Sequence, residues 1–190
     1  MAIWQFKLEV IPQKSVIERF GEIPKTLEIN REGWNDFWQK ITENIKSEPD
    51  FEDALTINWW TGVFFDKPQI ISAIDKLISY SKWEDDSSIT WKGDVNQNQD
   101  HDAFLCFDES GNVEEFHFRT DLRGNFTDFL TGMLEICRSQ NWLVMDGKGN
   151  LVEPNPAQVF DLIQTSNSVR FLTDPQKFFK DLESGEIKPE

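Results

Sequence analysis

The chain has 190 residues, of which 34 are acidic and 19 are basic, so its formal net charge is −15. Nucleic acids and anionic membranes both attract clustered Lys and Arg, so this charge argues against either as a partner. With 38% hydrophobic residues, among them 16 Phe and 8 Trp, the chain is too apolar for intrinsic disorder. These values predict a single domain over residues 1–190, with a core that needs no disulfide or metal.

The cysteine spacing and the lack of a signal peptide or membrane-spanning segment indicate the cellular location. Cys106 and Cys137 lack CxxC spacing, and reduced thiols are the expected state, although one disulfide is arithmetically allowed. The first residues show no basic segment followed by a long apolar run, so no signal peptide is expected. The longest uncharged stretch, 54–65, is too short to cross a bilayer. The protein is therefore expected to be cytoplasmic.

The first part of the chain is predicted to form one strand followed by helices. Apolar and polar residues alternate over 4–10, which is typical of a half-buried strand, and Pro12 ends it. A short helix is predicted over 15–20, and another helix is predicted to begin after Asp66. The strongest helical periodicity spans 34–45 and predicts an amphipathic helix with these residues in the core: Trp34, Phe37, Trp38, Ile41 and Ile45.

The second part of the chain contains hairpins and helices in separate runs. Strands are predicted over 88–91, 103–107, 113–122, 142–145 and 151–152, with a turn at 108–112. Helices are predicted over 126–137, 156–164 and 175–182, with a short one between the last two. This order predicts an α+β fold, in which an antiparallel sheet with hairpins near 88–122 and 142–152 packs helices on one face.

Most of the negative charge lies within residues 84–121. This segment has eleven acidic residues against Lys92 and Arg119, for a net charge of −9. Eight of the acidic residues are the candidate partner-binding face: Glu84, Asp85, Asp86, Asp94, Asp100, Asp102, Asp108 and Glu109. Such a face steers a basic partner toward the molecule, whereas the alternative is that the charge only confers solubility.

A second candidate site is an ionisable stripe that consists of His117, Arg119, Asp121 and Arg123. Strand periodicity puts these residues on one face, opposite Phe116 and Phe118. Such a row can hold an acid–base pair or bind an anionic ligand. A solvated ion-pair ladder has the same pattern, so both interpretations stay open.

Neither a metal site nor a cofactor is expected. Oxygen-bearing side chains over 94–102 resemble the start of a calcium loop, but Gln99 and Leu105 replace the Gly and the bidentate Glu that such a loop needs. A solvated loop and a weak divalent-cation site are the two interpretations. His101 and His117 have no Cys near enough for a zinc set, and G-x-S-x-G and phosphate-loop motifs are absent. The chain is therefore expected not to be an enzyme.

Adjacent Trp59 and Trp60 are hard to place, because neighbours on one strand point to opposite faces. Core or rim packing is one interpretation. The other is that one ring is exposed and binds a partner or a sugar. An exposed pair would also suit a structural module within a larger assembly.

The second half of the chain resembles a family of small uncharacterised bacterial proteins. The resemblance rests on 91–94 (Trp-Lys-Gly-Asp), the hairpin through 111–113, 118–123 (Phe-Arg-Thr-Asp-Leu-Arg) and 168–175. In that family a W-G-x-x-D-type loop precedes a strand ending in R-x-D-L-R and then a helix, and Lys92 departs from the pattern. Some small acidic proteins of this kind are immunity proteins, so the resemblance implies a basic toxin as partner and no catalytic residue.

Two functional hypotheses follow. The first is a non-enzymatic cytoplasmic protein that docks on a basic partner, such as a toxin nuclease that it neutralises. The alternative is a small enzyme or ligand-binding domain that uses the His117–Arg123 strand face, which predicts a concave pocket and a shifted pKa at that face.

Overall fold

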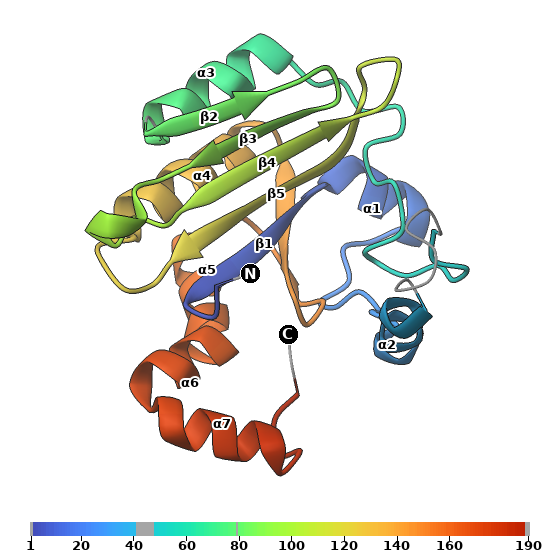
Figure 1. Ribbon diagram of the computed structural model, residues 1–190. Helices are drawn as coiled ribbons and strands as arrows, with labels where there is room; N and C mark the ends of the chain where they lie inside the picture. Colours follow the sequence, from blue (N-terminus) through green and yellow to red (C-terminus); the bar gives the residue numbers. More distant parts are fainter. Residues whose placement is uncertain (1, 41–47, 79, 189–190) are drawn as a thin grey trace.

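A computed structural model describes residues 2–40, 48–78 and 80–188, and its centre is one seven-stranded antiparallel sheet (Figure 1). The strand order across the sheet is β2-β3-β4-β5-β1-β6-β7. The strands are β1 (Gln5–Pro12), β2 (Ser81–Glu84), β3 (Ser88–Lys92), β4 (Asp102–Phe107), β5 (Val113–Asp121), β6 (Trp142–Asp146) and β7 (Leu151–Val152). The first strand therefore lies in the interior of the sheet, between β5 and β6.

Helices connect and cover these strands. They are α1 (Gln13–Phe20), α2 (Arg31–Lys40), α3 (Lys67–Leu77), α4 (Thr127–Ser139), α5 (Pro156–Gln164), α6 (Asn167–Thr173) and α7 (Pro175–Glu183), with a 3-10 turn η1 (Val95–Gln97). In Figure 1, α3 and α4 lie behind the sheet, whereas α2 and the α6–α7 pair lie beyond its lower part on opposite sides. Among the described residues, no helix combines the length and apolarity that a bilayer span requires.

The main core lies between the sheet and the helices α3 and α4. Phe6 and Leu8 of β1 and Phe118 of β5 are buried on this face, and the rings of Phe118 and Phe129 meet edge to face at 6.1 Å. At Gly132 of α4 an added Cβ would lie 2.5 Å from the Leu77 side chain, so α3 and α4 pack closely there. Burying one such side chain contributes about 1.5–3 kcal/mol.

The predicted α+β fold and both hairpins are confirmed. The helices predicted in the second half are present, including the short α6. The helix after Asp66 begins as expected, because the Asp66 side chain accepts from the Gln69 N–H and Pro68 occupies the first turn. The sequence did not indicate β2, a short edge strand whose Trp83 is 58% exposed.

The prediction that the helix over 34–45 packs in the core is wrong. This helix is α2, and it buries none of its residues; Trp38 is 59% exposed. Its aromatic face forms a local cluster instead, in which Trp34 stacks on Trp38 and meets Phe51 edge to face. The predicted positions 41 and 45 lie outside the described residues. Amphipathic spacing indicates an apolar face but not what covers it.

Trp59 and Trp60 are both buried, at 6% and 3% exposure, so the interpretation of an exposed ring is wrong. They lie in turns rather than in a strand, and the alternation of strand side chains does not apply to them. The Trp59 indole N–H donates to the Ala54 carbonyl at 2.8 Å. Trp60 meets Trp142 edge to face at 5.1 Å. The pair therefore joins the turn to the core.

Candidate functional site

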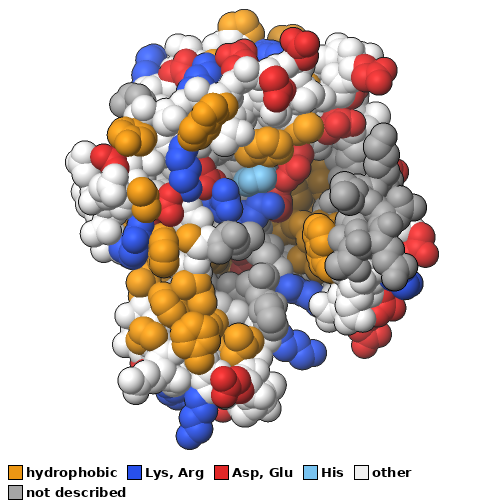
Figure 2. Space-filling model, viewed as in Figure 1, with side chains coloured by type: hydrophobic (Ala, Val, Ile, Leu, Met, Phe, Trp, Pro, Cys, Tyr) orange, Lys and Arg blue, Asp and Glu red, His pale blue; other side chains and the backbone are white. Residues whose placement is uncertain are grey.

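The face of the sheet opposite α3 and α4 carries charged side chains, and Figure 2 shows a histidine there among acidic and basic groups. One row across four strands consists of charged residues, with Lys92 opposite Asp102, Asp102 opposite Arg119, and Arg119 opposite Lys7. We call this row the charge ladder. In the next row, His117 of β5 lies opposite Glu9 of β1. This open face is therefore the candidate site.

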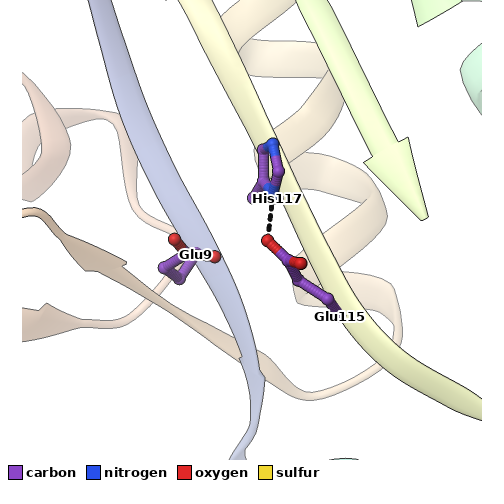
Figure 3. Close-up of side chains that lie close together, drawn as sticks. All are labelled: Glu9, Glu115 and His117. Carbon is purple, nitrogen blue, oxygen red and sulfur yellow. Dashed lines mark hydrogen bonds and ion pairs between the residues drawn. The ribbon is translucent and has the colours of Figure 1, made fainter. Parts of the chain in front are cut away.

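At its centre, Glu9, Glu115 and His117 converge (Figure 3). Their ligand-type atoms all lie within 4.8 Å of one another, and His117 Nδ1 is 2.6 Å from Glu115 Oε1. The ammonium of Lys7 lies 2.6 Å from Glu9 and 3.9 Å from Glu115. We call these four residues the Glu–His cluster. Two carboxylates, an imidazole and an ammonium thus share one small area of the sheet.

The hydrogen bond with His117 holds the pKa of Glu115 below its ordinary value, although burial opposes the effect and the Lys7 charge assists it. Glu115 is therefore ionised near neutral pH and acts as an acceptor for the His117 ring. When Nδ1 donates to this carboxylate, Nε2 is the free acceptor of the imidazole. The cluster can hold a proton or bind a cationic group.

Arg119, the next member of the predicted stripe, belongs to the charge ladder instead. Its Nε donates to Asp102 Oδ1 at 2.7 Å, and Asp102 Oδ2 accepts from the Lys92 ammonium at 3.1 Å. Lys92 also pairs with Asp100. Asp102 is only 2% exposed, so its charge is neutralised by these two cations rather than displayed to a partner.

Asp121 and Arg123 form a separate, structural contact. Asp121 is fully buried and accepts from the Asp100 N–H at 2.9 Å and from Arg123 Nη2 at 2.7 Å. Burial alone would raise the pKa of Asp121, but the Arg123 and backbone hydrogen bonds outweigh it and lower that pKa. The Arg123 guanidinium also lies over the Trp4 ring, 4.2 Å from its centroid. This contact fixes the loop before β4 to the end of β5.

The second histidine, His101, has a structural position too. Its Nδ1 accepts from the Asp121 N–H at 3.0 Å, and its ring stacks on Phe129 at 4.4 Å. Desolvation lowers the pKa of His101, although Asp121 and the other nearby carboxylates oppose the shift. His101 is thus a neutral core histidine, buried beside the Asp121–Arg123 pair.

The loop over 94–102, considered as a calcium site, does not gather its oxygen atoms. Asp94 caps η1 by accepting from the Asn96 N–H. Asp100 and Asp102 are paired with cations of the charge ladder. At Gly93 an added Cβ would lie 2.0 Å from the Gln99 carbonyl oxygen, so the loop closes tightly on itself. Its carboxylates are therefore engaged in a helix cap and in ion pairs.

The eight residues of the predicted acidic face divide between opposite ends of the sheet. Asp94, Asp100 and Asp102 lie at the Lys92 end of β3, and the last two are buried. The other five lie around two turns at the Ser88 end, roughly 13 Å away along the strand. We call these five residues, of which all but the half-buried Asp108 are exposed, the acidic turn patch: Glu84, Asp85, Asp86, Asp108 and Glu109.

The Glu–His cluster borders a cleft of about 1620 Å³, seen as a hollow in Figure 2. Lys7, Glu9 and Glu115 line it from the sheet, Trp34 and Trp38 from α2, and other apolar residues from α7. Cys106 also lines the cleft, but burial and the nearby Glu114 and Glu115 charges raise the pKa of its thiol. The thiolate needed of a nucleophile is therefore disfavoured here.

Sequence reasoning found only His117 of this cluster. Lys7 and Glu9 appeared as polar positions of the first strand, and Glu115 as part of the charged segment. The polar alternation of 5, 7 and 9 indicates that these side chains share the open face. It does not indicate that Glu9 pairs with His117, because 108 positions separate them.

No family model, curated protein or solved structure matches this chain. The resemblance of 91–94 and 118–123 to a bacterial family therefore stays a prediction. The structure does give the motif residues Gly93, Asp121 and Arg123 a shared role in closing the loop before β4.

Proposed function

We propose that the protein is a non-enzymatic protein-binding module that docks on a basic partner through the acidic turn patch. The observation that carries this proposal is the adjacency of the two turns. Ser88 pairs with Cys106, and the Phe107 N–H donates to the Ser87 carbonyl at 2.8 Å. Five acidic side chains, four of them exposed and Asp108 half-buried, therefore lie on neighbouring turns at one end of the sheet.

The two turns are held by their own carboxylates. Asp85 Oδ1 accepts from the N–H groups of Ser87 and Ser88 at 2.8 and 2.7 Å. Asp108 Oδ1 accepts from the N–H groups of Ser110 and Asn112 at 2.9 and 2.8 Å. Hydrogen bonds lower the pKa of both carboxyl groups, chiefly from the Asn112 side chain at Asp108 and from the Ser87 N–H at Asp85, so the charges persist in mildly acidic solution. A rigid patch loses less entropy on binding than a mobile one.

In the part of the chain that the structure describes, two lysines lie near the acidic turn patch. Lys82 is 3.7 Å from Glu84, and Lys67 lies over the Phe107 ring at 3.8 Å from its centroid. Five carboxylates outnumber these two charges, so the local field stays negative. A negative surface of this kind speeds association with a basic protein, and the effect weakens as salt rises.

The chemistry of the partner follows from this field. A basic protein such as a toxin nuclease fits it, and this is also the partner that the bacterial resemblance implies. In that role the protein would act as an immunity protein. Two free cysteines, Cys106 and Cys137, support a cytoplasmic location because disulfides are rare in that compartment.

The test is the association rate of the protein that co-purifies with this chain from its native host. We expect this rate to fall about tenfold or more between low and physiological salt. The variant D86N/E109Q should slow association at low salt, whereas the matched variant E153Q/D161N, which is distant from the patch, should not. A salt-independent rate, or equal rates for both variants, would refute the proposal.

The cleft favours a second candidate, a ligand-binding domain that uses the open face of the sheet. The supporting observation is that Glu9 and Glu115 line a cleft whose far wall carries Trp38. Thermal-shift screening against small metabolites tests it, with Trp38→Ala as the variant and Trp83→Ala as the control. Both rings are similarly exposed, at 59% and 58%, but only Trp38 lines the cleft. Equal ligand responses in both variants would exclude the cleft.

A further inference from the structure

We propose that Glu9, Glu115 and His117 bind one divalent transition-metal ion of the zinc class on the open face of the sheet. This site involves none of the acidic turn patch, so it is independent of the protein-binding proposal. It borders the cleft of the ligand-binding candidate, but the ion alone is tested here, without any organic ligand.

The geometry suits an ion of this class. A tetrahedral zinc ion with bonds of about 2.0–2.2 Å holds its ligands about 3.3–3.6 Å apart. In the structure the three donor groups lie within 4.8 Å of one another, and the closest pair, His117 Nδ1 and Glu115 Oε1, is 2.6 Å apart. The ion displaces the proton of the hydrogen bond between Nδ1 and Glu115 to solvent, and small side-chain rotations bring all three groups to the required separation. The fourth position then faces the cleft, where water completes the coordination.

The types of ligand atom in the site determine which metal ions it favours. Imidazole and carboxylate together suit zinc, cobalt and nickel, whereas magnesium and calcium prefer oxygen ligands alone. The two strands supply a stable frame, because Glu9 and His117 are directly opposite in the β1–β5 register and Glu115 lies two residues along the same strand. Ligands on paired strands are positioned more precisely than ligands on a loop.

The Lys7 ammonium competes with the metal ion for the carboxylates of the site. Its ammonium lies 2.6 Å from Glu9 and 3.9 Å from Glu115 and balances their charge in the absence of metal. The Lys7 side chain is 28% exposed, so it can turn toward solvent when an ion enters. This arrangement predicts that removing the lysine charge strengthens metal binding.

The experiment is calorimetric titration of the full chain with zinc chloride, repeated with cobalt to follow the visible absorption of the tetrahedral ion. We expect one ion per chain, with affinity weakened about tenfold or more in both His117→Ala and Glu9→Gln. Glu114→Gln is the matched carboxylate control, since Glu114 neighbours the cluster on β5 but is not part of it. It should leave the affinity unchanged.

Lys7→Met gives a result that a nonspecific acidic surface would not produce. We expect zinc affinity to increase several-fold in Lys7→Met and to stay constant in Lys14→Met, a lysine of α1 paired with Glu18. Circular dichroism and thermal unfolding show that each variant is folded before titration. No saturable binding at millimolar zinc, equal affinity in the His117 and Glu114 variants, or weaker binding in Lys7→Met would overturn the proposal.

Discussion

The Asp121 carboxylate receives two hydrogen bonds from the Arg123 guanidinium, with Oδ2 2.7 Å from Nη2 and Oδ1 3.0 Å from Nε. Asp121 is fully buried, whereas the Arg123 side chain is 23% exposed. The carboxylate is thus removed from water and depends on this partner and on the Asp100 N–H. The pair secures the end of β5.

Asp121→Asn should therefore destabilise the fold. The amide cannot accept all of the hydrogen bonds that the carboxylate receives, and Arg123 loses its counter-ion. We expect the free energy of unfolding to fall by about 2–4 kcal/mol, measured by urea denaturation. Asp86→Asn, in an exposed turn, should change it by less than about 0.5 kcal/mol. Equal effects at the two positions would contradict the structural role of Asp121.

His101 should make stability depend on pH. Its pKa in the folded state lies below the ordinary value of about 6.5, so the unfolded chain takes up a proton first as pH falls. Stability is therefore complete above about pH 6.5 and decreases as pH falls toward the folded-state pKa. The contribution is at most about 1.4 kcal/mol for each unit of pKa difference.

Urea denaturation at about pH 7.5 and about pH 5.5 measures this effect. In His101→Asn the side-chain oxygen can replace Nδ1 as the acceptor of the Asp121 N–H, but the group does not titrate. We expect the variant to lose less stability than the wild type between the two pH values. The same loss in both proteins would show that other groups cause the pH dependence.

Gly93→Ala tests the tight closure of the loop before β4. The added Cβ would lie 2.0 Å from the Gln99 carbonyl oxygen, so backbone must move. We expect the free energy of unfolding, measured by thermal denaturation, to fall by about 3 kcal/mol or more. Gly111→Ala is the comparison, because Gly111 has open space around it and only a positive φ of 81°. Gly111→Ala should lower the free energy of unfolding by about 1 kcal/mol. A larger destabilisation by Gly111→Ala than by Gly93→Ala would contradict the structure.

Trp60→Ala tests the burial of the tryptophan pair. Trp60 meets Trp142 and Phe65 edge to face at 5.1 and 5.8 Å. Truncating such a ring should cost about 3–5 kcal/mol in urea denaturation. Trp83→Ala, at an exposed edge strand, should cost less than about 1 kcal/mol. A small effect at Trp60 would mean that the turn is not joined to the core.

The positions of helices and strands could be predicted from the sequence better than the surfaces against which they pack. Alternation and turn residues identified β3, β4 and β5 because periodicity and turn chemistry are local properties. Sequence reasoning failed at α2, where regular apolar spacing predicts burial in the core but Trp38 lines the cleft. It also missed β2, whose four residues have no apolar alternation.

The candidate site was predicted only in part for the same reason. Only His117, Arg119 and Asp121 of the stripe share a face of β5, because the strand ends before Arg123. Asp121 is buried, and Arg119 is bound to Asp102. His117 lies opposite Glu9, which belongs to a strand at the other end of the sequence. Which strands become neighbours depends on the tertiary fold, and no local pattern in this chain encodes it.

The interior position of β1 has a consequence for how the chain folds. Gln5 pairs with Asp121 and Pro12 pairs with Trp142. Neither edge of the first strand can therefore form its hydrogen bonds until residues much later in the chain have been synthesised. Such non-local pairing raises the contact order, which slows folding compared with a chain of local hairpins. Until β1 inserts, the β2–β5 meander and the β6–β7 hairpin have no common sheet. Insertion of this strand is therefore the event that unites them.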